Sequence, residues 1–300
     1  MGRAVGVLAS DHVAVGLVEN NQLVGSIHVF PQEEEDPQSL LASLPADDFS
    51  HAILEQIELA ARDQKVEAVG VAIPGIVKDG IVQDSPNLQQ LKGLHLQEQL
   101  SAALGSRPAP VRVGVFNDAD VVAAGIAAKL GRLQHLIRVW TLGNGIGFGR
   151  YPWTEGVWEG GHTVVTLDPH EHYCGCGGRG HLEGIMGHRA MRLRFLDMEP
   201  EEVFASAKSG DPRCEAFVKQ WHRALAAATA NSIHMTGPGK FFITGPNSRY
   251  VDLDLLYLYL NDMVKMTPLQ GSQMEVIATT DEIGIIGAAV NAQMAARIST

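Results

Sequence analysis

The sequence predicts an α/β protein made of two similar halves. Three observations support this class: strand-like runs rich in β-branched residues alternate with helical patterns, a similar order of elements occurs twice, and the chain has 300 residues. A chain of this length exceeds the size at which one hydrophobic core usually keeps growing, so we expect a division near the middle. The alternation places helices on the faces of a mixed sheet, because a parallel crossover needs a helix to return the chain.

The first half begins with three strands and continues with alternating helices and strands. The second and third strands are separated by the turn Glu19-Asn20-Asn21, so we expect a meander. We take Ser50 as a helix N-cap because apolar residues from Ile53 to Ala61 recur on one helical face. The expected elements are strands at 4–9, 12–18, 23–30, 68–73 and 111–116, and helices after Ser50, around 94–104 and after Asp118.

The second half repeats this order and predicts an internal duplication. Strands are expected at 135–142, 146–151 and 163–167, followed by long helices that alternate with strands at 241–244 and 276–279. Between two such halves a ligand is expected in the cleft, outside the carboxyl ends of the strands. We place an N-terminal domain at 1–118, completed by a C-terminal helix over 284–300, and a C-terminal domain at 119–283.

The composition indicates a soluble protein and argues against several function classes. A formal net charge of -11 disfavours a nucleic-acid or anionic-membrane surface, because phosphate binding needs clustered Lys and Arg. Three cysteines form no disulfide framework and indicate a reducing compartment. The chain shows neither a secretory leader pattern nor an apolar run of membrane-spanning length. We therefore expect a cytoplasmic protein without nucleic-acid or membrane partners.

A glycine-rich loop combines soft metal ligands with carboxylates. It contains Glu-Gly-Gly-His at 159–162 and Cys-Gly-Cys-Gly-Gly-Arg-Gly-His-Leu-Glu at 174–183. Thiols separated by one residue do not easily satisfy disulfide geometry, whereas tetrahedral zinc accepts Cys sulfur and His nitrogen. We predict a closed structural zinc site formed by His162, Cys174, Cys176 and His181; a metalloenzyme would need an open position. The alternative is a flexible loop with incidental thiols, and three other histidines compete for the fourth position: His170, His172 and His188.

This loop resembles the signature of the ROK family of sugar kinases and sugar-responsive repressors, which reads Glu-x-Gly-His and then Cys-x-Cys-Gly-x-x-Gly-Cys-x-Glu. Every element is present except the third cysteine, which is His181. The resemblance covers nearly the whole chain and implies two ribonuclease H-like domains of the actin/hexokinase superfamily around a central cleft. It also implies that the family's tendency to oligomerise extends to a homodimer here. By position, zinc ligands match His162, Cys174 and Cys176, and residues that contact sugar hydroxyls match Glu159, His162 and Glu183.

Further segments resemble the family's sugar pocket. Asn117 and Asp118 end a strand and open a helix, and the resemblance implies that Asn117 binds the sugar and that Asp118 is the catalytic base. Gly75 and Asn87 lie in segments that resemble the pocket lining. The alternatives are that Asp118 is only a helix N-cap and that the other two segments are strand-end turns.

The resemblance implies transfer of the ATP γ-phosphoryl group to a sugar hydroxyl with Mg²⁺, but the nucleotide-binding segments depart from the family. Where the family has Asp-x-Gly-Gly-Thr, the chain reads Leu-Ala-Ser-Asp-His at 8–12, without a glycine that lets amides approach phosphates. The phosphate hairpin at 143–145 has Asn144 in place of Thr and is also typical of a type I′ turn. The adenosine-side Gly-Gly becomes Gly245-Pro246, where proline removes an amide donor.

Two functions follow from this asymmetry. The first is a ROK-type kinase of a hexose or amino sugar, with Asp118 as the base. The second is a non-catalytic sugar-binding relative that senses or sequesters its ligand. For the kinase, the expected nucleotide-binding residues are Ser10, Asp11, Gly143, Asn144, Gly145 and Gly245.

Overall fold

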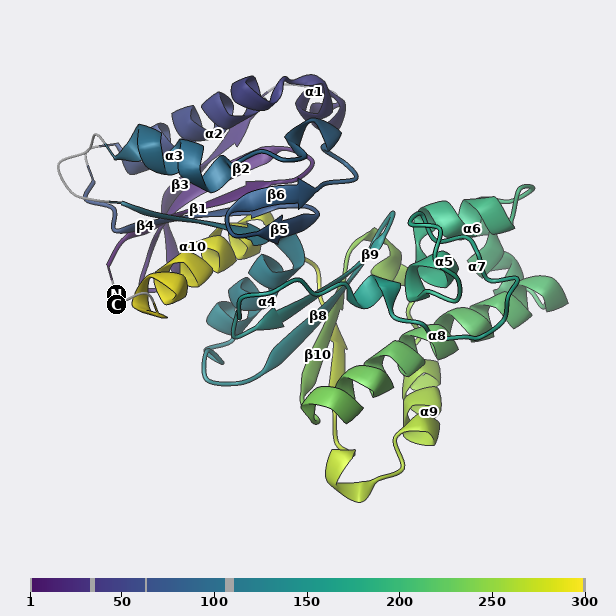
Figure 1. Ribbon diagram of the computed structural model, residues 1–300. Helices are drawn as coiled ribbons and strands as arrows, with labels where there is room; N and C mark the ends of the chain where they lie inside the picture. The colour runs from purple at the N-terminus through teal and green to yellow at the C-terminus, as the bar shows by residue number, and fades with distance from the viewer. Residues whose placement is uncertain (1, 33–35, 63, 106–110, 299–300) are drawn as a thin grey trace. The chain divides into compact units, whose positions relative to one another are not determined.

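The computed structural model describes residues 2–32, 36–62, 64–105 and 111–298 (Figure 1). The chain forms two compact units. Residues 1–137, 149–157 and 279–300 make up the first unit, and residues 138–148 and 158–278 make up the second. Each unit is built on a separate sheet with its own hydrophobic core. Among the described helices, none combines the length and the apolar character needed to cross a bilayer.

The first unit contains a five-stranded mixed sheet with the order β3-β2-β1-β4-β7. β2 is antiparallel to both β1 and β3, whereas β4 is parallel to β1 and β7 is parallel to β4. Asn20 and Asn21 have φ of 53° and 62°, the combination typical of a type I′ turn, so the predicted meander is present. The strands are β1 (Ala4–Ala9), β2 (Val13–Glu19), β3 (Gln22–Phe30), β4 (Ala68–Ile73), β7 (Arg112–Asn117) and the small hairpin β5 (Ile76–Lys78) and β6 (Ile81–Asp84).

Helices cover both faces of this sheet (Figure 1). α2 packs against β1, β2 and β3, and α3 packs against β7, whereas α10 packs against β1, β4 and β7 from the other side. The last two residues of the expected C-terminal helix, 299 and 300, lie outside the described residues. The helices of this unit are α1 (Pro37–Ser43), α2 (Ala46–Ala61), α3 (Leu96–Leu104), α4 (Asp118–Lys129), α10 (Asp281–Ile298) and the 3₁₀ segment Gln89–Leu91.

α10 lies directly on the sheet because the strands beneath it carry glycine. A Cβ atom on Gly6 would lie 1.8 Å from the carbonyl oxygen of Ile285, and one on Gly70 would lie 1.9 Å from that of Ala288. α4 also packs closely against α10. The first unit consequently continues through α4, past the boundary that we placed at residue 118.

The second unit contains a four-stranded sheet with the order β11-β10-β8-β9. Its core includes the fully buried rings of Trp140, Trp221 and Phe241. The strands of this sheet are β8 (Ile137–Leu142), β9 (Ile146–Tyr151), β10 (Lys240–Thr244) and β11 (Gln273–Val276); the first residue of β8 and the last three of β9 are assigned to the first unit. The helices are α5 (Leu182–Met186), α6 (His188–Arg194), α7 (Pro200–Lys208), α8 (Pro212–Thr236), α9 (Leu253–Met263) and the 3₁₀ segments Gly160–His162, Pro246–Tyr250 and Thr267–Leu269.

The prediction that Ser50 is an N-cap is wrong. α2 begins at Ala46, directly after Pro45, and Asp47 and Asp48 lie in its first turn, where negative charge is favourable. Ser50 lies inside the helix, and its hydroxyl donates to the carbonyl oxygen of Ala46 at 3.0 Å. The polar side chain therefore bonds back to the helix instead of starting it.

Two strand predictions in the second unit also need correction. Residues 163–167 form no strand, and their ladder contact is a single bridge between Val164 and His181. This segment is instead one arm of the loop at 159–183 that carries the four predicted zinc ligands, which we call the metal loop. β11 spans Gln273–Val276 and ends where we expected a strand to begin. The residues after it lead into α10, where the Thr280 hydroxyl accepts a hydrogen bond from the amide of Ile283 at 3.4 Å.

Candidate functional site

The four predicted zinc ligands lie together in the second unit. Their ligand atoms are within 4.8 Å of one another. Cys174 Sγ is 3.4 Å from both Cys176 Sγ and His162 Nδ1, and His181 Nδ1 is 3.3 Å from Cys176 Sγ. Tetrahedral bonds of about 2.0–2.3 Å to zinc correspond to ligand–ligand distances of roughly 3.3–3.8 Å. The donors and their spacing therefore fit a zinc ion.

The other loop histidines do not join this cluster. His170 Nδ1 lies 2.9 Å from an oxygen of Asp168, and His172 stacks on the ring of Tyr173. His188 is the first residue of α6 and donates its backbone amide to Gly143. Within the described ranges, the cluster of potential ligands includes His181 and none of its three competitors.

Backbone pairing brings the two arms of the loop together. Leu182 donates its amide to the carbonyl oxygen of Thr163 at 3.0 Å, and Val165 donates to that of Gly180 at 2.8 Å. This pairing places His162, at the start of one arm, beside His181 on the other, with 3.4 Å between their Nδ1 atoms. The short arms therefore assemble ligands that are 19 positions apart in the sequence.

The protonation of these groups is coupled to metal binding. Burial raises the pKa of the Cys174 thiol to about 12, and the Cys176 thiol beside it contributes to the rise. Since zinc binds thiolate, loading the site must remove this proton. Burial lowers the pKa of His181, as does nearby His162, and so favours the neutral imidazole that binds metals.

Two carboxylates adjoin the cluster. His162 turns Nδ1 toward the thiols, and its Nε2 lies 3.8 Å from Glu159 Oε2. Burial raises the pKa of Glu159; the charge of His162 lowers it and that of Glu183 raises it. Glu183 accepts hydrogen bonds from Cys174 Sγ at 3.5 Å and from the amide of Ile146 at 3.0 Å. The predicted sugar-contacting residues of this unit thus surround the predicted metal site.

In the first unit, Asn117 is the N-cap of α4. Its Oδ1 accepts hydrogen bonds from the amides of Ala119 at 2.9 Å and Asp120 at 3.4 Å. Its Nδ2 donates to the carbonyl oxygen of Gly75 at 2.8 Å. Asp118 is the first helical residue and accepts from the amide of Ala119 at 2.9 Å. The interpretation of Asp118 as the N-cap is therefore wrong.

The segments that contain Gly75 and Asn87 are also held together. Gly75 has φ of +114°, and a Cβ atom there would lie 2.2 Å from the carbonyl oxygen of Asp84, which explains the glycine. Ser85, which is buried, donates its hydroxyl to the carbonyl oxygen of Pro74 at 2.6 Å. Asn87 follows two residues later and is exposed.

The segment at 10–12, where the resemblance predicts an altered phosphate loop, is a short hairpin turn. The amide of Ser10 donates to the carbonyl oxygen of His12 at 3.2 Å, and Asp11 between them is exposed. His12 Nε2 lies 2.9 Å from Asp281 Oδ2, and this hydrogen bond raises the pKa of His12 although burial opposes it. One backbone amide of the turn is therefore already used inside the hairpin.

Leu8, at the position of the family's aspartate, faces α10. A Cβ atom built on Gly284 would lie 2.9 Å from Leu8 Cδ2 and 3.4 Å from its Cβ. The leucine side chain thus packs against the helix backbone at a residue that lacks a side chain.

The second phosphate segment, the turn at 143–145, joins the end of β8 to β9. Its first carbonyl oxygen, on Gly143, accepts hydrogen bonds from the amide of His188 at 2.9 Å and from Asn247 Nδ2 at 3.0 Å. Neither Asn144 nor Gly145 has positive φ, so the type I′ interpretation is wrong. Asn247 is buried, and its hydrogen bond to Gly143 connects this turn to the segment after Gly245. No signal in the sequence indicated this role of Asn247.

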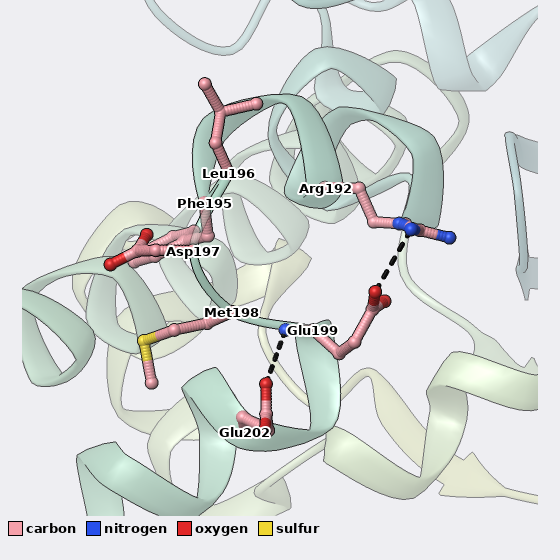
Figure 2. Close-up of a pocket in the computed structure, with 7 residues that line it drawn as sticks. All are labelled: Arg192, Phe195, Leu196, Asp197, Met198, Glu199 and Glu202. Carbon is pink, nitrogen blue, oxygen red and sulfur yellow. Dashed lines mark hydrogen bonds and ion pairs between the residues drawn. The ribbon is translucent and has the colours of Figure 1, made fainter.

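A cavity of about 330 Å³ lies beside α6 and α7, and Figure 2 shows seven residues that line it. Its polar groups already pair with each other: Arg192 contacts Glu199 at 3.0 Å, and the amide of Glu199 donates to Glu202 at 2.8 Å. None of the predicted site residues lines this cavity. The predicted site residues thus form two groups that are described separately: the Cys/His cluster with Glu159 and Glu183 in the second unit, and the residues around Asn117 and Asp118 in the first.

Two α/β units, one of which carries a Cys/His cluster flanked by carboxylates, define a protein of the actin/hexokinase fold. The ROK family matches residues 26–294 of the chain. This protein belongs to the ROK family.

Two similar proteins are named as sugar kinases. The chain is 28% identical over 241 residues to a glucokinase of Pyrobaculum calidifontis, with 74% of this chain and 77% of that protein covered. It is 28% identical over 243 residues to an N-acetylmannosamine kinase of Haemophilus influenzae, with 77% and 79% covered. The crystal structure of a ROK hexokinase from Thermus thermophilus superposes with a TM-score of 0.80 at 23% identity, covering 99% of each chain. The predicted family and fold are confirmed.

Proposed function

We propose that the protein is a sugar kinase that transfers the γ-phosphoryl group of ATP to a hydroxyl of a hexose or amino sugar. The observation that carries this proposal is that Asn117, and not Asp118, is the N-cap of α4. The hydrogen bond that Asp118 accepts from the amide of Ala119 duplicates one that Asn117 already accepts, so capping does not require the carboxylate of Asp118. An aspartate at this position matches the family's catalytic base, and the relatives at 28% identity are named as kinases.

In the proposed reaction Asp118 accepts the proton of the sugar hydroxyl as the hydroxyl oxygen attacks the γ-phosphorus. The bond between the γ-phosphorus and the bridging oxygen breaks, and ADP leaves with the electron pair. Mg²⁺ would neutralise charge on the phosphates, since phosphoryl transfer depends mainly on positioning and charge stabilisation. The protein's contribution is therefore to hold the sugar hydroxyl close to the carboxylate of Asp118.

Sugar recognition is assigned to Glu159, His162 and Glu183. Carboxylate and imidazole groups accept and donate the hydrogen bonds that sugar hydroxyls need. His162 would serve both functions, with Nδ1 toward the metal and Nε2 toward Glu159 and the ligand. Zinc held by the four ligands would fix the loop and take no part in bond breaking, because four protein ligands close its coordination.

The second candidate function is sugar binding without phosphoryl transfer. The hairpin at 10–12 favours it, because the amide of Ser10 is bonded within the turn and no glycine allows close approach to phosphate. The predicted nucleotide-binding residues of the second unit match the family's glycine pattern better than Ser10 and Asp11 do. They are Gly143, Asn144, Gly145 and Gly245. The two candidate functions therefore differ in the nucleotide and agree on the sugar.

Thermal shift with a panel of hexoses and N-acetylated amino sugars tests both candidates, together with coupled ATP turnover. A ligand at a hundredfold excess over its Kd stabilises the native state by about 2.7 kcal/mol, a shift of several degrees. A sugar that raises the Tm and is phosphorylated supports the kinase. A sugar shift without turnover and without a Mg-ATP shift supports the binding protein, and no shift with any sugar contradicts both.

Homodimerisation and a cytoplasmic location stay predictions. Analytical ultracentrifugation of the full chain checks the first, and fractionation of the source cells checks the second. Neither outcome alters the assignment of the sugar-contacting residues.

A further inference from the structure

Glu171 and Arg194, which are not among the predicted zinc ligands, form a buried ion pair at the metal loop. The side chains of Glu171 and Arg194 are 7% and 17% exposed. Arg194 Nη1 donates to Glu171 Oε1 at 3.0 Å, Arg194 Nη2 pairs with Oε2, and Gln220 Nε2 donates to Oε1 at 2.7 Å. A paired arrangement of two donors and two acceptors fixes orientation as well as distance. Because burying an ion pair costs desolvation energy, its role is better sought in geometry than in stability.

The guanidinium of Arg194 also reaches the residues beside the predicted ligands. Its Cζ lies 4.4 Å from the centre of the Tyr173 ring, directly before Cys174. Its Nη2 lies 3.3 Å from the carbonyl oxygen of Gly184, directly after Glu183. One side chain on α6 therefore touches the neighbours of a metal ligand and of a sugar-contacting carboxylate.

The backbone of Glu171 forms a hydrogen bond with the arm of the loop that contains His181. Its carbonyl oxygen accepts a hydrogen bond from the amide of Gly180 at 2.7 Å, directly before His181. The side chain of the same residue is held by Arg194 and Gln220 on α6 and α8. The pair thus connects the His181 arm of the loop to two helices of the unit's core.

We propose that Glu171 and Arg194 are positioning residues that hold the Cys/His cluster and Glu183 in binding geometry. They act on the ligands through Tyr173, Gly180 and Gly184, and they contact neither metal nor sugar. The pair carries no net charge, so it acts through geometry and leaves the charge of the metal site unchanged. Its effect on the metal is independent of the kinase assignment, whereas its effect on sugar affinity rests on the proposed function.

The test measures how fast zinc is released from the full-length protein to a chromogenic chelator. Arg194→Lys keeps the charge but loses the planar two-donor group, and Glu171→Gln keeps the shape but loses the charge. We expect each variant to release zinc about tenfold faster or more, since loss of groups that support metal ligands typically costs 10–100-fold in affinity. Arg213→Lys is the matched control, because it alters an exposed ion pair with Asp197 away from the loop.

Stability is separated from positioning by a second control. Cys214→Ser alters a buried residue of the same core whose sulfur lies 4.0 Å from that of Met198 and which is not one of the clustered ligands, so it should lower the Tm and leave zinc release unchanged. If Arg194→Lys does not fold, Gln220→Ala removes one donor to Glu171 and should accelerate release in the same direction. Wild-type release rates in Glu171→Gln and Gln220→Ala overturn the proposal, as does equally fast release from Cys214→Ser.

Sugar affinity provides an additional readout. In Glu171→Gln the sugar KM should rise while kcat at saturating sugar stays close to wild type, because Glu183 is displaced and Asp118 is not. A fall in kcat alone contradicts a positioning role for the sugar site. If the wild-type protein binds no sugar at all, the proposed function fails, and the zinc-release rates still decide whether the pair positions the metal ligands.

Discussion

The carboxylate of Glu183 joins two parts of the second unit, because it accepts a hydrogen bond from the amide of Ile146 at 3.0 Å while its other oxygen lies 3.5 Å from Cys174 Sγ. Ile146 is the first residue of β9, directly after the turn at 143–145. One predicted sugar contact is therefore bound to both the predicted metal site and the predicted phosphate turn. Changes at any of the three are expected to affect the other two.

The metal prediction is about one zinc per chain. Cys176→Ser should lose the metal and lower the Tm, although by less than the roughly 10 kcal/mol that zinc contributes to isolated zinc-finger peptides, since this loop lies on a folded unit. Elemental analysis of protein purified without chelator checks both forms. Cys214→Ser should keep its zinc, because Cys214 is buried on α8 and is not one of the four clustered ligands. Zinc-free wild-type protein contradicts the prediction.

The catalytic prediction concerns Asp118. If the protein transfers phosphate, Asp118→Asn should reduce turnover on the order of a hundredfold or more, because the amide keeps the shape but cannot accept the proton. Sugar binding, measured by calorimetry, should remain close to wild type.

A variant of the neighbouring residue separates catalysis from capping. Asn117→Ala should lower the free energy of unfolding by about 1 kcal/mol, the usual effect of removing an N-cap. Asp118→Asn should lower it less, because Asn117 accepts hydrogen bonds from the amides of both Ala119 and Asp120, and the one that Asp118 accepts comes from the same Ala119 amide. Wild-type turnover in Asp118→Asn would remove Asp118 from the mechanism.

We predict that zinc binding through His181 depends on the absence of a side chain at Gly178. A Cβ atom at this position would lie 2.1 Å from His181 Cε1, so Gly178→Ala should displace the imidazole and weaken zinc binding. In the background of His181→Cys, which restores the family's ligand, the same change should have a smaller effect because the side chain is shorter. Competition with a zinc-binding dye measures the four proteins, and equal losses in both backgrounds would exclude a specific conflict with the imidazole.

The pair of His12 and Asp281 predicts a pH-dependent contribution to stability. The hydrogen bond to Asp281 raises the pKa of His12 above its ordinary value of 6.5, and Asp11 adds to the rise. The pair therefore stabilises the fold fully below pH 6.5, and this contribution is lost as the pH rises through the folded-state pKa. Urea unfolding of Asp281→Asn should show a larger deficit at pH 6 than at pH 8.5.

A matched control tests whether that pH dependence is specific. His51 contacts Glu55 on the exposed face of α2, and His51→Gln should leave the pH profile of stability nearly unchanged. An Asp281→Asn deficit of the same size at both pH values would mean that the pair acts without the charge of His12.

Regular periodicity made most of the fold predictable from the sequence. Runs such as Ala4–Ala9 and Ala68–Ile73 are strands in the structure, because apolar β-branched residues fit buried positions in the sheet. The segment at 163–167 has the same composition but pairs as one arm of a loop. There, long-range contacts to Gly180 and Leu182 override the local preference.

The candidate site was predictable where residue type carries the chemistry. The ligand types at 162, 174, 176 and 181 pointed to zinc, and the structure brings those side chains together. The contacts of Glu171 and Asn247 could not be predicted, because they depend on partners that are distant in the sequence. An isolated Glu or Asn in a loop carries no indication of a buried partner.

The contact between Leu8 and Gly284 has a consequence for any attempt to introduce the family's aspartate at position 8. Leu8→Asp alone would place a carboxylate against the backbone of α10, a poor place to recruit a cation. The glycine-free turn that follows, in which His12 also pairs with Asp281, would have to change as well before this segment matched the family's phosphate loop. Introducing the aspartate by itself would therefore replace an apolar contact with α10 and leave the rest of the loop unaltered.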